Sequence, residues 1–465
     1  MSKAIWALDA TETARLINTK QLSARDAVEA HLERLSQVNP KLNAVVRVLA
    51  DEARAEADAA DKAVKSGAHL GPLHGVPITT KINSDQTGCP TDNGVIMFKD
   101  LMAREDSPQV GSLRRAGAIV IGRTNSPAFA MRLTTDNALH GQTWNPWDKA
   151  ITCGGSSGGA GAALATGVGA LAQGNDIGGS IRWPAYCNGV VGLRPTIGRV
   201  PAHNPTATLP RNFAAQLMSV NGPMARSVRD IRLGLTVMSE RDARDPVWVP
   251  APLEGPPLAH LKAAIAIDKT LPEETIAAMR RAGKHLAAAG YAVEEIEPPD
   301  LNRVADLWAD IGLTEIGAAL TPLIGSLGDE GMKKSMGDLW AAKGRSDLGV
   351  YMAALREREA LLIKWQKFME TYPIIVLPSA GELQLPYDID VQGPSALDRT
   401  MQSHRYQLML PVLGLPGLAV PMGTAKGWPM GVQIVSRRFR EDLILAAGEV
   451  IEAREPPITP IDVKW

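Results

Sequence analysis

The sequence is poor in the residues that form disulfides and metal sites. Its 465 residues include only three cysteines, Cys89, Cys153 and Cys187, and eight histidines. The cysteines show no C-x-x-C spacing and the histidines no H-E-x-x-H pattern. An odd number of widely spaced cysteines argues against both a disulfide framework and a zinc site. We therefore expect no bound metal ion and no other cofactor.

The chain also lacks an excess of one charge and a long apolar run. Its 49 basic and 50 acidic residues give a formal net charge of −1, so no long-range field attracts nucleic acid or an anionic membrane. The apolar stretch at residues 408–422 contains three prolines and is shorter than the about 20 residues of a spanning helix. The N-terminus MSKAIWALDATETARL has no continuous apolar segment typical of a secretory signal. We expect a cytoplasmic protein without nucleic-acid or membrane partners; its oligomeric state stays open, with a homodimer as one expectation.

What is present is typical of a large α/β protein. The chain is 45% hydrophobic and 21% charged, which suffices for a large core. Short apolar runs bounded by glycine and proline are typical of buried strands: GVPITTKI, GAIVIG, YPIIVLP, LAVPMG and GVQIVS. Residues 260 to 298 show the order strand, helix, strand, with Pro272 in the first turn of the helix and Gly290 just past its end, which indicates a βαβ unit. The pattern predicts a large mixed, mostly parallel twisted β-sheet covered by helices on both faces.

Two runs rich in glycine and serine follow each other in the first half of the chain. The run TCGGSSGGAGAALATGVGALAQG places Ser156 and Ser157 between pairs of glycines, and GNDIGGSIRWPA places Ser180 directly after two glycines. Glycine costs backbone entropy in regular elements, so such clusters indicate close backbone approach or unusual dihedral angles. The small residues at 160–172, between the two runs, predict a buried helix.

Two interpretations explain only part of these runs. The pattern G-x-G-x-x-A at residues 167–172 loosely fits a dinucleotide-binding fingerprint, but no strand precedes it. The pattern G-x-S-x-G at residues 154–158 fits the nucleophile elbow of α/β-hydrolases, which would require a downstream acid and a histidine such as His404. That interpretation leaves the second run unexplained.

In a third interpretation Ser180 is a nucleophile. The backbone N–H groups of Ile177, Gly178, Gly179 and Ser180 would then form an oxyanion hole. A serine nucleophile needs a base, and no histidine lies near either run, whereas GVPITTKIN provides Lys81. Only about one part in 2,500 of a free lysine is neutral at pH 7, which is a free-energy deficit of about 4.6 kcal/mol for the neutral form. Burial lowers a lysine pKa enough to cover that deficit.

Lys81, the GGSSGG loop at 154–159 and the GNDIGGSIRWPA motif together resemble the amidase signature family. The family motif around its nucleophile is similar to G-x-D-x-G-G-S-x-R-x-P-A, which residues 174–185 match without substitution. Further family-like stretches are GPLHGVPITTKI, GRTNSPAFA, GPMARSVRD, GLPGLAVPMG and GVQIVSRRF. The resemblance covers nearly the whole chain and implies the amidase signature fold and a Ser, cis-Ser, Lys triad.

The resemblance also implies a role for individual residues. Ser180 matches the nucleophile, Ser156 the bridging serine behind a non-proline cis peptide, and Lys81 the base. Three further residues match a hydrogen-bonded shell around the triad, with a role as loop caps as the alternative; these are Ser157, Asp176 and Arg182.

Two departures from the family pattern remove carboxylates near this site. Ile82 follows the lysine where relatives often have Asp, and Ala128 stands where Glu is common, which suggests a more apolar surrounding. Four residues are candidates either for lining an apolar substrate pocket or for the core: Met131, Trp144, Trp183 and Tyr186.

The predicted function is serine-dependent hydrolysis of carbon–nitrogen amide bonds through an acyl-enzyme. Neutral aryl or alkyl amides are the expected small-molecule substrates, with carbamates (urethanes) or esters as extensions. The alternative is the A subunit of a glutamine-dependent aminoacyl-tRNA amidotransferase. Its tyrosine-rich SSGYYD-type stretch has no counterpart here, because the corresponding RSDLGVYMAALRERE contains only Tyr351.

We assign the whole chain, 1–465, to one amidase domain built from four segments. The segments are an N-terminal helical layer at about 1–70, a catalytic core at about 71–235, a connection rich in proline and charge at about 240–258, and the C-terminal part of the same sheet at about 259–455. Within the first segment, Ser23 and Asp26 predict a helix start, and a second helix is expected to end at Gly67.

Overall fold

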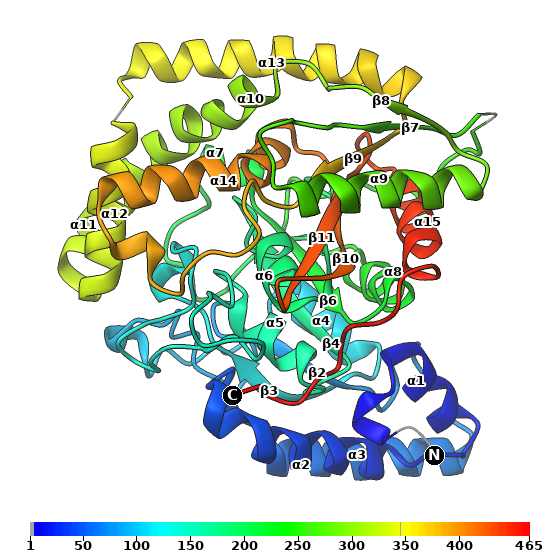
Figure 1. Ribbon diagram of the computed structural model, residues 1–465. Helices are drawn as coiled ribbons and strands as arrows, with labels where there is room; N and C mark the ends of the chain where they lie inside the picture. Colours follow the sequence, from blue (N-terminus) through cyan, green and yellow to red (C-terminus); the bar gives the residue numbers. More distant parts are fainter. Residues whose placement is uncertain (1–3, 259, 345) are drawn as a thin grey trace.

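The computed structural model describes residues 4–258, 260–344 and 346–465 (Figure 1). Within these residues 11 strands form one sheet in the order β1-β3-β2-β4-β6-β5-β10-β11-β9-β7-β8. The strands are β1 Val45–Val48, β2 Pro77–Lys81, β3 Ile119–Thr124, β4 Leu171–Asp176, β5 Val191–Arg194, β6 Val220–Ala225, β7 Lys262–Ile265, β8 Ala292–Glu295, β9 Ile374–Pro378, β10 Gly417–Ala425 and β11 Trp428–Val435. The predicted α/β fold with a large mixed sheet is confirmed, and so is the parallel pairing of β7 with β8.

The prediction that the sheet is mostly parallel is wrong. Only four of the ten neighbouring pairs are parallel, two on each side of the centre, and the outermost pair of β1 with β3 is antiparallel. The centre, from β4 to β9, is antiparallel and contains the hairpin of β10 and β11. Lys426 and Gly427 form its turn with φ of 53° and 86°, as a two-residue hairpin turn of this kind requires. Short apolar runs occur in buried strands of both directions, so the run pattern alone carried no information on direction.

Helices cover both faces of the sheet, as predicted. The helices are α1 Ala10–Asn18, α2 Ala24–Leu42, α3 Ala50–Ser66, α4 Pro108–Arg115, α5 Gly158–Ala165, α6 Arg182–Asn188, α7 Phe213–Met218, α8 Val228–Met238, α9 Glu273–Ala288, α10 Leu301–Trp308, α11 Thr314–Leu327, α12 Glu330–Lys343, α13 Leu348–Thr371, α14 Pro394–Leu413 and α15 Glu441–Glu452. Helices α4, α8, α15 and α9 follow each other across one face, while α2, α5 and α6 cover the other.

Local chemistry explains where several helices begin and end. The Ser23 side chain accepts a hydrogen bond from the Asp26 N–H at the start of α2, and Gly67, with φ of 73°, ends α3. The helix expected over residues 160–172 is shorter than predicted, because Gly167 and Gly169 adopt φ of 84° and 73° and end it before β4 begins. The N-terminal helical layer also contains strand β1, which pairs with β3 and was not predicted.

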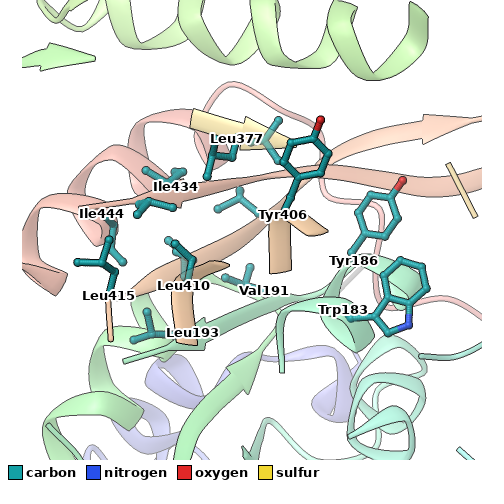
Figure 2. Close-up of a cluster of buried hydrophobic side chains, with 14 of the residues drawn as sticks. Trp183, Tyr186, Val191, Leu193, Leu377, Tyr406, Leu410, Leu415, Ile434 and Ile444 are labelled. Atoms are coloured by element: carbon teal, nitrogen blue, oxygen red, sulfur yellow. The ribbon is translucent and has the colours of Figure 1, made fainter. Parts of the chain in front are cut away.

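Part of the core lies between α14 and the centre of the sheet, on the face that also carries α6 (Figure 2). Leu377 from β9 and Tyr406 and Leu410 from α14 belong to this part, and all three are at most 2% exposed. Val191 and Leu193 of β5 flank Gly192, which faces α6, so these two equally buried side chains point to the opposite face of the sheet. Burying each large apolar side chain contributes about 1.5–3 kcal/mol. This packing fixes α14 beside the loop that follows β4.

One described stretch, Leu301–Leu327 over α10 and α11, is long and apolar enough to cross a membrane by length and composition alone. Inside the fold, 44% of that window is buried, and α10 packs against α14. Core helices of the same composition pass this test as well, so the stretch is weak evidence for a membrane span.

Candidate active site

Adjacent strand ends bring the three predicted catalytic residues to one edge of the sheet. Lys81 is the last residue of β2, and β4, its parallel neighbour, ends directly before the loop that carries Ser180. Ser156 lies in the loop before α5, behind a cis Gly155–Ser156 peptide bond. The N–H of Ser157 donates to the carbonyl of Ser180 over 3.2 Å and joins the two loops. The two glycine-serine runs therefore form one site.

The Lys81 side chain is completely buried and has three polar neighbours. Its Nζ lies 2.7 Å from Ser156 Oγ, 3.2 Å from Ser157 Oγ and 2.8 Å from Asn175 Oδ1. Burial lowers the pKa of Lys81 well below its ordinary value, and the Asp176 charge opposes this only in part. No carboxylate among the described residues forms an ion pair with this amine. The surroundings thus favour a neutral amine.

Asn175 is a neighbour of the lysine that we did not predict. Its Nδ2 donates to Asn83 Oδ1 over 2.9 Å, which leaves Oδ1 directed at the amine. Asn175 lies inside the GNDIGGS motif, and this position could have identified it as a site residue. The relay is not continuous in hydrogen bonds, because within the described residues none joins Ser156 Oγ to Ser180 Oγ. Catalytic hydrogen bonds are often loose without substrate and tighten when it binds.

The loop of residues 177–180 differs from the prediction at Gly179. The Gly179 N–H donates to Asp176 Oδ1 over 2.9 Å, so it is directed away from an oxyanion and the prediction is wrong for this donor. The N–H groups of Ile177, Gly178 and Ser180 make no hydrogen bond with any described residue. These three donors are available to a ligand oxygen beside Ser180.

His404 does not act as the partner of Ser156 that a nucleophile elbow would need. Its Nε2 lies 2.6 Å from the carbonyl oxygen of Gly178, and burial lowers the pKa of the ring to about 4. A carbonyl only accepts, so Nε2 carries the proton and cannot take another from a serine. This geometry disfavours the α/β-hydrolase interpretation.

Asp176 and Arg182 form a buried ion pair behind the site. Arg182 donates to both carboxylate oxygens over 3.0 and 3.1 Å, and Arg194 donates to Oδ1 over 3.2 Å. Burial alone would raise the pKa of Asp176, but the two guanidinium groups outweigh it and hold the pKa far below its ordinary range. The carboxylate also accepts the N–H groups of Gly179 and Ile181. A permanent charge therefore fixes the loop on which Ser180 stands.

We expect Asp176→Ala to lower the free energy of unfolding by about 3–5 kcal/mol, because two buried guanidinium groups lose their counter-charge. Urea denaturation at neutral pH measures the change. The control is Glu382→Ala, which breaks an exposed ion pair with Arg399 and should cost about 0–1 kcal/mol. Equal effects of the two substitutions would contradict the assignment.

A cavity of about 50 Å³ lies beside Ser180. Its lining is mostly apolar and consists of Ala130, Met131, Arg132, Leu133, Ile177, Gly178, Ser180, Trp308, Ser335, Leu339, Leu397, Met401 and Leu408. Met131, one of the four pocket candidates, lines this cavity. A larger groove of about 930 Å³ between α3 and α4 contains none of the predicted site residues.

The other three aromatic candidates do not line the cavity. Trp183 is 1% exposed, donates from Nε1 to the Leu133 carbonyl and stacks on Tyr186 (Figure 2). Tyr186 is itself buried and donates to the Leu383 carbonyl, so both belong to the core. Trp144 packs against Tyr387 instead, with ring centroids 5.5 Å apart. Aromatic rings carry a large apolar surface, and these three rings pack it against neighbouring side chains of the protein.

No group of three or more His, Cys, Asp or Glu side chains in the described ranges is placed to hold a metal ion. The arrangement offers instead a buried amine, two hydroxyl groups in sequence and a set of backbone donors. Such groups can activate an oxygen nucleophile and stabilise a tetrahedral oxyanion.

Comparison with known proteins agrees with this chemistry. The family model for amidases matches residues 26–445. The chain is 47% identical to an indoleacetamide hydrolase of Bradyrhizobium diazoefficiens over 97% of its own length and 87% of the relative's. It is 29% identical to the A subunit of a glutamyl-tRNA(Gln) amidotransferase of Moorella thermoacetica, with 96% of each chain covered. The crystal structure of a bacterial aryl acylamidase of the amidase signature enzymes superposes with a TM-score of 0.83 at 26% identity, covering 99% of this chain and 98% of that one. The protein is therefore an amidase and belongs to the amidase signature family.

Proposed function

We propose that this amidase hydrolyses neutral arylacetamides such as indole-3-acetamide through an acyl-enzyme on Ser180. The observation that carries the proposal is the buried Lys81 amine, 2.7 Å from Ser156 Oγ, beside a serine that faces an apolar cavity. The similarity to an indoleacetamide hydrolase over 97% of the chain supports the substrate class.

The contacts of a neutral Lys81 amine account for the first proton transfer. Its two N–H groups donate to Asn175 Oδ1 and Ser157 Oγ, which leaves the lone pair for the hydroxyl proton of Ser156. Ser156 Oγ in turn takes the proton of Ser180, whose Oγ attacks the carbonyl carbon of the substrate. Lysine thus acts on the nucleophile through one intermediate hydroxyl.

The later steps use the same groups in reverse. The carbonyl oxygen becomes an oxyanion and accepts from the N–H groups of Ile177, Gly178 and Ser180, each worth about 2.7–4 kcal/mol. Ser156 gives a proton to the nitrogen as the carbon–nitrogen bond breaks, and ammonia leaves a primary amide. Water then loses a proton to the relay, attacks the acyl ester and releases the carboxylic acid together with Ser180.

The cavity beside Ser180 favours an uncharged, apolar acyl group. Trp308, Leu339 and Leu408 contribute apolar walls, and the charge of Arg132 is neutralised by Asp390, which accepts two hydrogen bonds of 3.0 Å. Pockets for small molecules usually have about 300–1,000 Å³, so the lining side chains have to move outward when an aryl group enters. The cavity wall formed by α12 is the expected moving part.

We expect indole-3-acetamide to be hydrolysed with a kcat/KM at least about 10³-fold above that of glutamine, because burying the ammonium and carboxylate of glutamine without partners costs several kcal/mol. A panel of indole-3-acetamide, phenylacetamide, acetanilide, a carbamate, an aryl ester and glutamine measures the preference by release of acid or amine. Ser180→Ala assayed on the same panel gives the background. Faster hydrolysis of glutamine than of every neutral amide would overturn the proposal.

The same panel tests the alternative role as the A component of an amidotransferase. The similarity to that protein is lower, at 29% identity, and the apolar cavity offers no unpaired charge for the ends of glutamine. Hydrolysis of the carbamate and the ester is part of the proposal, because both carbonyls can take the place of the amide above Ser180. Glutaminase activity together with co-purifying partner proteins would favour the alternative.

A further inference from the structure

Two side chains from the C-terminal half of the protein donate hydrogen bonds to the loop before Ser180. Trp308, the last residue of α10, donates from Nε1 to the carbonyl of Ile177 over 2.8 Å. His404, on α14, has its Nε2 2.6 Å from the carbonyl of Gly178. Trp308 is 6% exposed and His404 only 1%. The carbonyls of Ile177 and Gly178 are therefore both held by buried ring N–H groups.

Holding a carbonyl also fixes the N–H group of the same peptide unit. In a trans peptide the C=O and the following N–H point in opposite directions within one plane. The bond from Trp308 to the Ile177 carbonyl therefore sets the direction of the Gly178 N–H, one of the donors proposed for the oxyanion. The next peptide unit is held at both ends, by His404 at the Gly178 carbonyl and by Asp176 at the Gly179 N–H.

The two glycines of the loop allow both rings to come this close. A Cβ atom on Gly178 would lie 3.1 Å from Trp308 Cζ2, and one on Gly179 would lie 2.7 Å from His404 Nε2. Gly179 also has a φ of +109°, which side chains rarely allow. The GG pair of the motif thus serves the contact with Trp308 and His404 as well as the turn itself.

We propose that Trp308 and His404 are positioning residues of the oxyanion hole, an inference that rests on the proposed function of Ser180. Trp308 aims the Gly178 N–H, and His404 holds the peptide unit that lies between the Gly178 and Ser180 donors. Trp308 also lines the cavity for the acyl group. A bound acyl group therefore contacts the same side chain that orients the Gly178 N–H. Substrate binding and oxyanion stabilisation are coupled through this indole.

The test compares variants that remove one ring N–H at a time. Trp308→Phe keeps an aromatic ring but loses the donor, and His404→Leu loses the donor that His404→Gln retains. Trp365→Phe is the matched control, because its buried Nε1 donates to the Pro299 carbonyl in the same way but outside the site. Circular dichroism and thermal melting verify that each variant is folded.

We expect Trp308→Phe and His404→Leu to lower kcat for indole-3-acetamide about 10- to 100-fold, with KM within about threefold. His404→Gln should recover most of the loss made by His404→Leu, and Trp365→Phe should stay within about twofold of the wild type. Phenylacetaldehyde, which adds to Ser180 as a hemiacetal and places its oxygen in the hole, should bind about 10-fold or more weakly to Trp308→Phe. Phenylacetic acid, which forms no such adduct, should bind about equally well.

Two results would overturn the inference while the proposed function stands. One is a kcat of Trp308→Phe and His404→Leu within about threefold of Trp365→Phe; the other is an equal loss of affinity for the aldehyde and the acid. A wild type that hydrolyses no amide, carbamate or ester of the panel would instead contradict the proposed function and with it this inference.

Discussion

Ser180→Ala is expected to lower kcat for indole-3-acetamide by about 10⁴- to 10⁶-fold, as removal of a catalytic serine does in other hydrolases. Without the Ser180 oxygen no acyl-enzyme forms, and the backbone donors can stabilise only a slow direct attack by water. Substrate binding should change little, because Ser180 contributes one small part of the cavity wall. Chromatographic measurement of the released acid over hours quantifies the residual rate.

The matched control for this variant is Ser436→Ala. Ser436, which follows β11, is as buried as the site serines, but its hydroxyl donates to the carbonyl of Pro373, directly before β9 and away from Lys81. Its loss should leave kcat within about threefold of the wild type. A Ser180→Ala protein that retains more than about 1% of wild-type kcat would show that another group carries the nucleophilic oxygen.

Lys81→Met is expected to lower kcat by about 10⁴-fold or more, because the relay loses its proton acceptor. The same variant should be as stable as the wild type at high pH and relatively more stable at low pH. Burial lowers the pKa of Lys81 in the fold, so below the ordinary value of about 10.4 the unfolded chain binds more protons than the folded one. The wild type therefore loses stability as pH falls through this window, whereas Met carries no proton.

Urea denaturation at pH 6 and pH 9 measures this difference between wild type and Lys81→Met. The exposed Lys364, paired with Asp300 at the surface, provides the control, since Lys364→Met should change neither kcat nor the pH dependence. A Lys81→Met protein with the same pH dependence of stability as the wild type would mean that Lys81 is charged in the fold.

The contacts of Lys81 and Ser156 could be anticipated from the sequence because the motifs that carry them resemble those of the amidase signature family. A glycine-serine loop, a glycine-rich turn before Ser180 and a lysine at the end of an apolar strand have recognisable patterns. The direction of the Gly179 N–H could not be anticipated in this way. It depends on the rotation of a single peptide unit toward Asp176, which composition does not determine.

The contacts of Trp308 and His404 with the loop before Ser180 could not be predicted from the sequence for a different reason. Their hydrogen bonds to Ile177 and Gly178 join residues 131 and 226 positions apart, and the packing of α10 on α14 brings them together. Trp183 was a pocket candidate because buried aromatic residues have the same sequence pattern in a core and in a binding site. The strand directions were mistaken because short apolar runs look alike in parallel and antiparallel sheets.

The proposed mechanism requires that a neutral, buried Lys81 activates Ser180 through Ser156. The rate at which a sulfonyl fluoride modifies Ser180, followed by mass spectrometry from pH 5 to pH 11, tests it most directly. With a neutral, buried lysine we expect the rate to rise with pH and to level off well below about 10.4, the ordinary lysine pKa, and we expect Lys81→Met to show no such rise. A rate that keeps rising up to that value in the wild type, or an unchanged profile in Lys81→Met, would contradict it.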